Sequence, residues 1–282
     1  MKKLLLIAAA LLLVGCTDAN ANLSDSSTTI FTVGNDTVTK GDVYELLVGR
    51  DAGYTVISVA TKFILDQEAP VTDAMRTAAD ETLATFESLY GDTLLSVVQS
   101  GGFADIDDFY ENNLLATEQL SELSRKYVDI NFDTLVETHR PKKVRVFTFA
   151  DEASAISAKT ALESGTSAAE VVETYASESD GSETLVTTSS SLDTAVLAYI
   201  SEATEAEVSE VMMGASVESY FVVQVVEADA EAMREEVIET LIALSDVSTS
   251  SDLYYFDQYK FRIYDQAVYD LIEINYPDYI MQ

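Results

Sequence analysis

The sequence predicts an α+β protein in which helices from both ends of the chain accompany an inserted part that contains strands as well as helices. Between residues 40 and 139, and again between residues 230 and 274, apolar residues recur at the spacing of three and four that marks a helix face. From Pro141 onward the pattern changes, and two strand-like runs, Lys143–Phe149 and Ser219–Glu227, enclose further helical stretches. We therefore expect a helical domain over residues 30–140, an α+β domain over residues 141–228, and C-terminal helices over residues 229–282 that pack on the first domain.

The chain begins with the features of an export signal. Lys2 and Lys3 precede the apolar run Leu4–Val14, which is too short to span a bilayer as a stable helix but suits the core of a signal peptide. Leu13-Val14-Gly15-Cys16 has the order of a lipoprotein cleavage site, where a diacylglyceryl group is attached to the cysteine sulfur and a peptidase cuts before it. We expect residues 1–15 to be a lipoprotein signal peptide and Cys16 to be the lipid attachment point. The alternative is an ordinary signal peptide followed by a chance cysteine.

The charge of the chain is strongly negative. Its 49 acidic and 16 basic residues give a formal net charge of −33, and removal of Lys2 and Lys3 with the signal peptide would make it −35. This excludes a general nucleic-acid binder, which needs a basic surface. It also disfavours lying flat on an anionic membrane, and it would attract basic unfolded chains or divalent cations. Because Cys16 is the only cysteine, an internal disulfide and a cysteine-based zinc site are excluded.

Residues 16–29 are small and polar after the cysteine, and we expect a flexible tether there. Ile30–Val33 then predicts a strand that returns after the turn Gly34–Asp36, and Thr39 has the character of a helix N-cap with Asp42 at the third helical position. The further helices are expected around positions 56–64, from Thr72 to Tyr90, over Leu94–Val98, and from Asp105 through Leu114–Val128, with breaks at Pro70, Gly91 and Gly101-Gly102.

In the inserted domain, the first and last strands are separated by smaller elements. Helices are expected over Ala153–Ser164, Ala168–Tyr175 and Asp193–Ile200, with short strands over Glu183–Thr188 and Val208–Met213. After the last strand, Ala230–Leu244 is expected to be a helix, Ser245–Ser250 a polar break, and Leu253–Ile274 one long helix. Part of that helix is expected to share a core with four residues of the first domain: Val43, Phe63, Phe86 and Leu89. Its many aromatic residues surround it, so some are candidates to line a groove for unfolded peptide.

The order of these pieces resembles the PrsA-type foldase lipoproteins, which are related to SurA-like chaperones and carry a parvulin-type peptidyl-prolyl isomerase domain in the middle. Val33–Tyr44 resembles the family's opening strand, turn and first helix, and Phe86–Leu95, which contains Tyr90-Gly91, resembles a later segment of the same domain. Lys143–Phe149 and Ser219–Val225 resemble the first and last strands of the isomerase domain. The resemblance covers nearly the whole chain. It implies a chaperone domain built from the N- and C-terminal segments, with a parvulin-like domain inserted.

The chain departs from this family at the positions of the isomerase active site. The family places two histidines at the base of the active site, in the first and last strands, and here these positions are Val146 and Phe221. The family's proline pocket uses large apolar residues, and Leu192 and Val196 fall near those places. Rotation about an X–Pro bond has a barrier of ~18–20 kcal/mol, and neither a valine nor a phenylalanine can offer a hydrogen bond to the twisted amide. The resemblance thus implies a degenerate domain without an assigned catalytic residue, in which Leu192, Val196 and Phe221 are candidate proline-pocket or client-binding residues.

The remaining residues that could act in catalysis or metal binding give weaker indications of function. His139, the only histidine, precedes Arg140-Pro141 and is expected to be an ordinary linker residue, since the sequence places no acid or nucleophile partner for it. A single histidine also excludes a histidine-clustered metal site. The acidic stretch Asp105–Glu111 lacks the glycine and the glutamate of a standard calcium loop and is interpreted as a helix start. We therefore expect no metal and no cofactor.

Together these observations predict an extracytoplasmic chaperone, lipid-anchored to the outer face of the cell membrane, that assists the folding of exported proteins. Its expected partners are unfolded or partly folded exported proteins, and its parvulin-like domain is expected to lack efficient isomerase activity. Two alternatives stay open. One is an active peptidyl-prolyl cis-trans isomerase with an altered site, and the other is a ligand-binding or adhesive surface lipoprotein without a role in folding.

Overall fold

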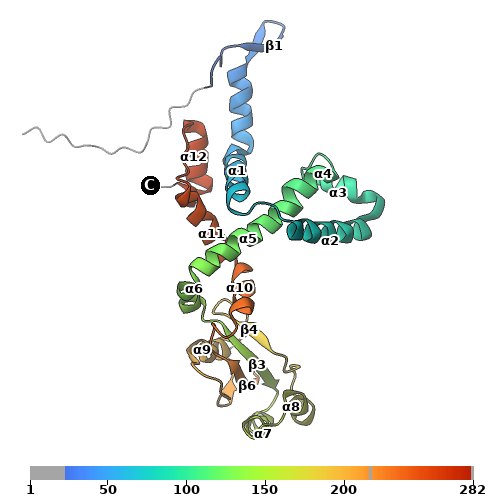
Figure 1. Ribbon diagram of the computed structural model, residues 1–282, viewed down its shortest axis with the longest axis vertical. Coiled ribbons are helices and arrows are strands. Elements are labelled where there is room, and N and C mark those ends of the chain that lie inside the picture. Colours follow the sequence, from blue (N-terminus) through green and yellow to red (C-terminus); the bar gives the residue numbers. More distant parts are fainter. Residues whose placement is uncertain (1–22, 216–217, 281–282) are drawn as a thin grey trace, which may run out of the picture. The chain divides into compact units, whose positions relative to one another are not determined.

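The computed structural model describes residues 23–215 and 218–280. The expected signal peptide and Cys16 lie outside the described residues. The chain divides into two compact units, of which unit 1 takes the residues up to Leu120 and those from Asp252 onward, and unit 2 is Ser121–Ser251. Unit 1 is helical apart from one hairpin, and unit 2 combines an antiparallel sheet with helices (Figure 1). The fold is therefore α+β, as predicted.

Unit 1 consists of a hairpin and a set of helices from both ends of the chain. In chain order its elements are β1 (Thr29–Val33), β2 (Asp36–Thr39), α1 (Lys40–Glu68), α2 (Asp73–Tyr90), the 3-10 turn η1 (Gly91–Thr93), α3 (Leu94–Ser100), α4 (Ile106–Phe109), the π-helical turn η2 (Tyr110–Leu114), the first turns of α5 (Leu115–Ile130), the second half of α11 (Ser245–Gln258), α12 (Gln266–Asn275) and the 3-10 turn η3 (Pro277–Tyr279). The predicted cap of α1 is confirmed. Thr39 Oγ1 accepts a hydrogen bond from Asp42 N at 3.2 Å, and Asp42 Oδ2 accepts one from Thr39 N at 2.7 Å.

The core of unit 1 has two parts. Helices α2, α3 and α4 close with the start of α5 around buried side chains such as Met75, Val98 and Leu115. Elsewhere α12 lies alongside α1 (Figure 1), and a Cβ atom added at Gly53 would be 3.4 Å from Ile272 Cγ1. The C-terminal segment therefore contacts the first helix of the same unit.

The prediction that Phe63 and Leu89 lie in this core is wrong. Their exposed fractions are 68% and 71%, whereas Val43 and Phe86 are partly buried. The next two residues of α1, Ile64 and Leu65, are both buried. Because consecutive residues point about 100° apart around a helix, Phe63 lies about 200° from Leu65, so burial of Ile64 and Leu65 leaves Phe63 facing solvent.

The prediction of one long C-terminal helix after a polar break is also wrong. Helix α11 already begins at Ser245, because Val247 is buried in the core of unit 2 and anchors the polar segment. It ends at Gln258 in a Schellman-type cap, in which Lys260 has a φ of 54° and Phe261 N donates to Phe256 O at 3.0 Å. A new N-cap then starts α12, where Asp265 Oδ1 accepts from Val268 N at 3.1 Å.

Unit 2 is built around a four-stranded antiparallel sheet of order β4-β3-β6-β5. Its elements are the last turns of α5, α6 (Phe132–His139), β3 (Lys142–Phe149), α7 (Glu152–Glu163), α8 (Ala168–Tyr175), β4 (Thr184–Val186), α9 (Thr194–Glu202), β5 (Met212–Met213), β6 (Tyr220–Glu227), α10 (Arg234–Ile242) and the first half of α11. The predicted first and last strands are confirmed as β3 and β6 to within one residue.

Each face of the sheet is covered by a different part of the chain. On one face, Phe147 and Val222 pack against α7 and α8. On the other face, Val144 and Val223 pack against α9. Helix α10 closes a third cluster with the end of α5 and with α6, where Val237 meets the buried side chains of these two helices. The sheet is therefore buried on both sides, and its α9-covered face holds the positions that the sequence singled out.

Candidate functional site

Val146 and Phe221 lie on the same face of the sheet. In the β3–β6 ladder Val146 is opposite Val223, and Phe221 is opposite Thr148. Residues directly opposite each other in an antiparallel pair share a face, as do residues two apart along one strand. Val146 and Phe221 are therefore diagonal neighbours on the face that α9 covers, within reach of each other's side chains.

The chemistry that this face offers is apolar contact. Phe221 is 8% exposed and belongs to the buried cluster, with Val146 partly buried at its edge. The nearby serine hydroxyls are committed to the strands. Ser179 Oγ donates to Val146 O at 2.7 Å, and Ser209 Oγ accepts from Val223 N at 2.9 Å. Two side chains without donors or acceptors thus occupy the places that the resemblance assigns to histidines, and neither can stabilise a twisted amide by hydrogen bonding.

The two other candidate pocket residues differ in accessibility. Val196, in the first turn of α9, is 1% exposed and packs in the same cluster as Phe221. Leu192 precedes the helix and is 36% exposed. Between them Asp193 caps α9, since its Oδ1 accepts from Ala195 N at 2.9 Å. The structure thus brings Val146, Val196 and Phe221 into one cluster, and Leu192 lies in the turn outside it. Their binding of proline or of a client stays a prediction.

His139 is buried rather than a linker residue, so that prediction is wrong. It is the last residue of α6 and is 4% exposed, and its backbone oxygen accepts from Thr188 N at 2.8 Å. Its Nε2 lies 3.8 Å from Asp246 Oδ2, and among the described residues its Nδ1 has no hydrogen-bond partner. The sequence pattern indicates a helix up to His139 but does not show which residues cover its side chain.

A larger site, which the sequence reading missed, lies in unit 1. An open cavity of about 520 Å³ is bounded by the second half of α1, by η2 and α5, and by single residues of α11 and η3. Its lining residues are Tyr54, Thr55, Ile57, Ser58, Val59, Thr61, Lys62, Leu65, Asn112, Ala116, Gln119, Leu120, Asp252 and Tyr279. Seven of these fourteen residues are apolar or aromatic and seven are polar, while most of the exposed wall surface is apolar, as is usual for a ligand site.

Asp252 and Tyr279 line this cavity and interact with each other. The Tyr279 hydroxyl hydrogen-bonds the Asp252 carboxyl group, and its ring packs edge-on against Phe256 at 4.8 Å between centroids. Burial raises the pKa of Asp252 to about 6, with the hydrogen bond from Tyr279 opposing that shift. Burial, and then the adjacent Asp252, raise the pKa of Tyr279 to about 12.

A sequence signal for Asp252 existed. It lies three and four residues before Tyr255 and Phe256, both of which are buried, so a helix through this segment places the carboxylate beside the buried face. The polar run Ser245–Ser250 concealed that helix. Gln119, a buried polar residue of the cavity, holds the end of α1 by donating from Nε2 to Ala69 O at 2.8 Å.

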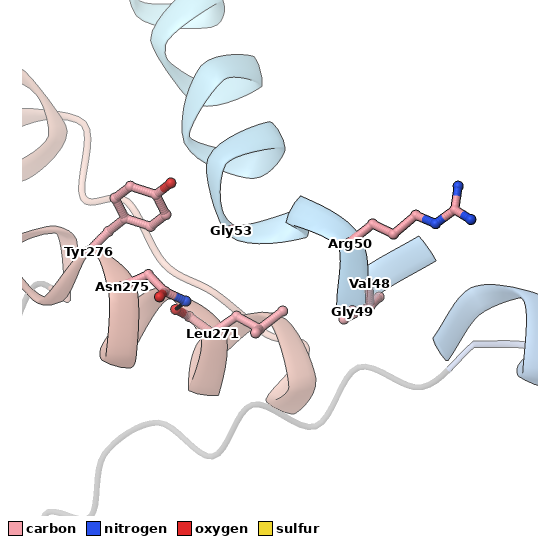
Figure 2. A pocket seen from close by; sticks show the side chains of 7 residues that line it. All are labelled: Val48, Gly49, Arg50, Gly53, Leu271, Asn275 and Tyr276. Carbon is pink, nitrogen blue, oxygen red and sulfur yellow. Dashed lines mark hydrogen bonds between the residues drawn. The ribbon is translucent and has the colours of Figure 1, made fainter. Parts of the chain in front are cut away.

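A smaller cavity of about 240 Å³ lies between α1 and α12. Figure 2 shows Leu271 and Asn275 of α12, with Tyr276 directly after the helix, on one side and the backbone of Gly53 on the other, while the Arg50 side chain extends away from them. A Cβ atom added at Gly49 would meet nothing within 4 Å, so the space beside this glycine is open. We assign no function to it.

The described residues contain neither a candidate metal site nor a candidate membrane-spanning helix. Within residues 23–215 and 218–280 no group of three or more histidine, cysteine, aspartate or glutamate side chains is placed to hold a metal ion. None of the helices in the same described ranges combines the length and apolarity needed to cross a membrane.

Comparisons with known proteins give structural neighbours only. No family model matches the chain, and no curated protein matches it in sequence. The structure is similar to a crystal structure of the foldase PrsA from Streptococcus pneumoniae, with 15% identity over 90% of this chain and 100% of that chain and a TM-score of 0.46. It is also similar to PrsA from Bacillus cereus, at 16% identity, 88% and 98% coverage and a TM-score of 0.48, and to PrsA from Bacillus subtilis, at 14% identity, 89% and 98% coverage and a TM-score of 0.38.

These neighbours carry the name of the family that the sequence resembles. Among these three neighbours the identities reach 16% and the TM-scores stay below 0.5.

Proposed function

We propose that the chain is a membrane-anchored extracytoplasmic chaperone that assists the folding of exported proteins. In this proposal residues 30–140 and 229–282 form the chaperone domain, residues 141–228 form a parvulin-like domain, and a lipid on Cys16 holds the protein at the outer face of the membrane. The partners are unfolded or partly folded exported chains. The sequence resemblance supports this assignment, and the observation that carries it is the open apolar cavity of unit 1.

The cavity suits an extended, partly apolar segment better than a compact cofactor. Tyr54 and Val59 line it, and their exposed fractions of 57% and 51% show that much of their surface faces solvent. An apolar surface that is exposed next to an open cavity is typical of a place where another chain binds. Tyr54 adds a rigid aromatic face that contacts many sequences at low entropic cost.

We further propose that the parvulin-like domain does not accelerate proline isomerisation efficiently. Apolar contact can hold an exposed chain without chemistry, whereas lowering the barrier to amide rotation requires a preorganised polar group at the reacting bond. Val146 and Phe221 supply none. They complete the core under α9, so the face would serve as structure or as a weak apolar contact.

One experiment with two readouts tests both proposals. The full chain should slow the aggregation of a chemically denatured client, while the isomerisation rate of a proline peptide, measured with a cis-discriminating protease, stays at background. The double variant Tyr54→Ser, Val59→Ser should lose at least about half of the aggregation suppression, because it removes apolar contact area at the cavity. Leu89→Ser is the matched control, since Leu89 is 71% exposed on α2 and does not line the cavity.

The outcomes separate the alternatives. Equal suppression by both variants would contradict the assignment of the cavity as the client site. Absence of suppression by the unmodified chain would contradict the chaperone proposal and favour a ligand-binding or adhesive lipoprotein. An isomerisation rate well above background that Phe221→Ala abolishes would establish the isomerase alternative.

A further inference from the structure

Within residues 23–215 and 218–280 no cation lies within salt-bridge distance of Asp252. The salt bridges among the described residues involve neither Asp252 nor Lys62, the one lysine of the cavity lining. A carboxylate that is removed from water loses its hydration, and this loss is offset only when a cation or several hydrogen bonds replace the water. Here the hydrogen bond from Tyr279 is the one favourable interaction that acts on the carboxyl group, and desolvation outweighs it.

We propose that the cavity receives a lysine or arginine side chain, flanked by apolar residues, of an unfolded exported polypeptide, and that the Asp252 carboxylate binds its cationic head. This inference rests on the proposed chaperone function and specifies which client segments the cavity selects.

The shape and chemistry of the cavity favour this occupant. Its walls include Ile57 and Leu65 on α1 and the ring of Tyr54, which suit the aliphatic stem of a long basic side chain. The Asp252 carboxylate lies on α11 and these apolar residues lie on α1. A basic side chain can therefore contact the apolar residues with its aliphatic stem and the carboxylate with its charged head. A volume of about 520 Å³ exceeds that of a single side chain, so neighbouring apolar residues of the client fit as well.

The charge of the whole chain acts in the same direction. With a formal net charge of −33, the protein attracts basic segments over a longer range and repels acidic ones. A divalent metal is a poor alternative occupant, because metal sites need several oxygen, nitrogen or sulfur ligands and the described residues contain no such cluster.

The pH dependence follows from the ionisable groups that face the cavity. These are Tyr54 and Lys62 on α1, Asp252 on α11 and Tyr279 on η3, while η2 and α5 contribute the uncharged Asn112 and Gln119. The pKa of Asp252 is about 6 and that of Tyr279 about 12, so of these two only Asp252 changes its charge between mildly acidic and neutral pH. Binding of a cation should be strong above pH 6 and weaken below it, since a lysine or arginine of the client keeps its charge throughout.

The test compares two short fluorescent peptides of the same apolar sequence with either lysine or glutamine at the centre. Fluorescence anisotropy measures their binding to the full chain at low ionic strength, at about pH 7.5 and about pH 5. At about pH 7.5 the lysine peptide is expected to bind about tenfold more tightly than the glutamine peptide, and this preference should weaken at about pH 5. Asp252→Asn should abolish this preference. The control is Asp257→Asn, which should retain the preference because Asp257 is exposed on the same helix and does not line the cavity.

The outcomes are distinguishable from those of the chaperone proposal. Equal binding of both peptides, or a preference that persists in Asp252→Asn, overturns the inference while leaving the chaperone function intact. Failure of the chain to bind either peptide and to suppress aggregation overturns the proposed function itself. If Asp252→Asn does not fold, the unmodified chain still decides the matter, because a lysine preference that is the same at both pH values contradicts a role for Asp252.

Discussion

Gly181 shows how one backbone conformation holds the edge of strand β3. The loop before it covers that edge, since Glu178 N donates to Thr148 O at 2.8 Å and Ser179 Oγ donates to Val146 O at 2.7 Å. Gly181 has a φ of 65°, in the left-handed region that favours glycine. A Cβ atom there would lie 2.8 Å from Phe147 Cε1, and the fully buried Phe147 ring has no space to move.

We expect Gly181→Ala to lower the free energy of unfolding by about 2–4 kcal/mol, because it adds overpacking to the cost of a left-handed alanine. Gly165→Ala is the matched control. Gly165 has a φ of 86° but nothing within 4 Å of an added Cβ, so only the conformational cost of about 1–2 kcal/mol applies. Urea unfolding of the three proteins measures the difference, and an equal shift of both variants would contradict the steric argument.

At the scale of residues, the family resemblance assigned Val146 and Phe221 to the base of one site, and the strand pattern alone did not. Once β3 and β6 pair in the observed register, the two residues must share a face. Asp252 could not be placed in the same way. Its environment depends on Tyr279, which is distant in sequence, and on a helix that begins in a run of serines because a single valine, Val247, is buried there.

Among the elements, α1 and α12 approach closely where α1 carries two glycines one turn apart. An added Cβ at Gly53 would be 3.4 Å from Ile272 and 3.5 Å from Tyr276, an ordinary van der Waals contact. The same atom at Gly49 would meet nothing within 4 Å. The contact between the two helices therefore limits the side chain at Gly53 and leaves room at Gly49, beside the cavity in Figure 2.

We expect Gly53→Ala to be neutral or to stabilise unit 1 by up to about 1 kcal/mol, because alanine favours a helix more than glycine does. Gly53→Leu should destabilise it by about 1–3 kcal/mol, since its outer carbons must enter space that the buried Ile272 occupies. Gly49→Leu is the matched control and should be tolerated. Circular dichroism melts report the order of stability, and a Gly53→Leu protein that melts with or above Gly49→Leu would refute the close contact.

At the element scale the sequence predicted where helices and strands begin more reliably than where a helix continues. Thr39, Thr72 and Asp105 all cap helices as expected, because capping is a local interaction of one side chain with the next turn. The break after Gln258 escaped prediction because the Schellman-type cap places a lysine in the left-handed conformation, where glycine is the usual signal.

At the scale of the whole molecule, the change of periodicity at Pro141 predicted the fold class. It did not predict which side chains of the helices pack against one another. Helical spacing identifies an apolar face but does not say which neighbour covers it, and Phe63 is exposed for that reason. Unit 1 is assembled from both ends of the chain, which is a property of contacts between distant segments. The order of helical and strand-containing segments along the chain led to this expectation and the family resemblance agreed with it, whereas composition alone could not predict it.

The last prediction concerns how the whole molecule is held in place. Its formal charge of −33 disfavours adsorption on an anionic membrane, so the proposed attachment relies on the lipid on Cys16. Two acyl chains anchor a protein stably where one binds only marginally.

We expect the unmodified chain, expressed in a bacterium, to incorporate labelled palmitate and to remain with the membranes after a high-salt wash. Cys16→Ala should lose the label, whereas Thr17→Ala, at the adjacent position, should keep both. Label and membrane retention that survive in Cys16→Ala would disprove the anchor, and release of all three proteins without label would indicate an ordinary signal peptide.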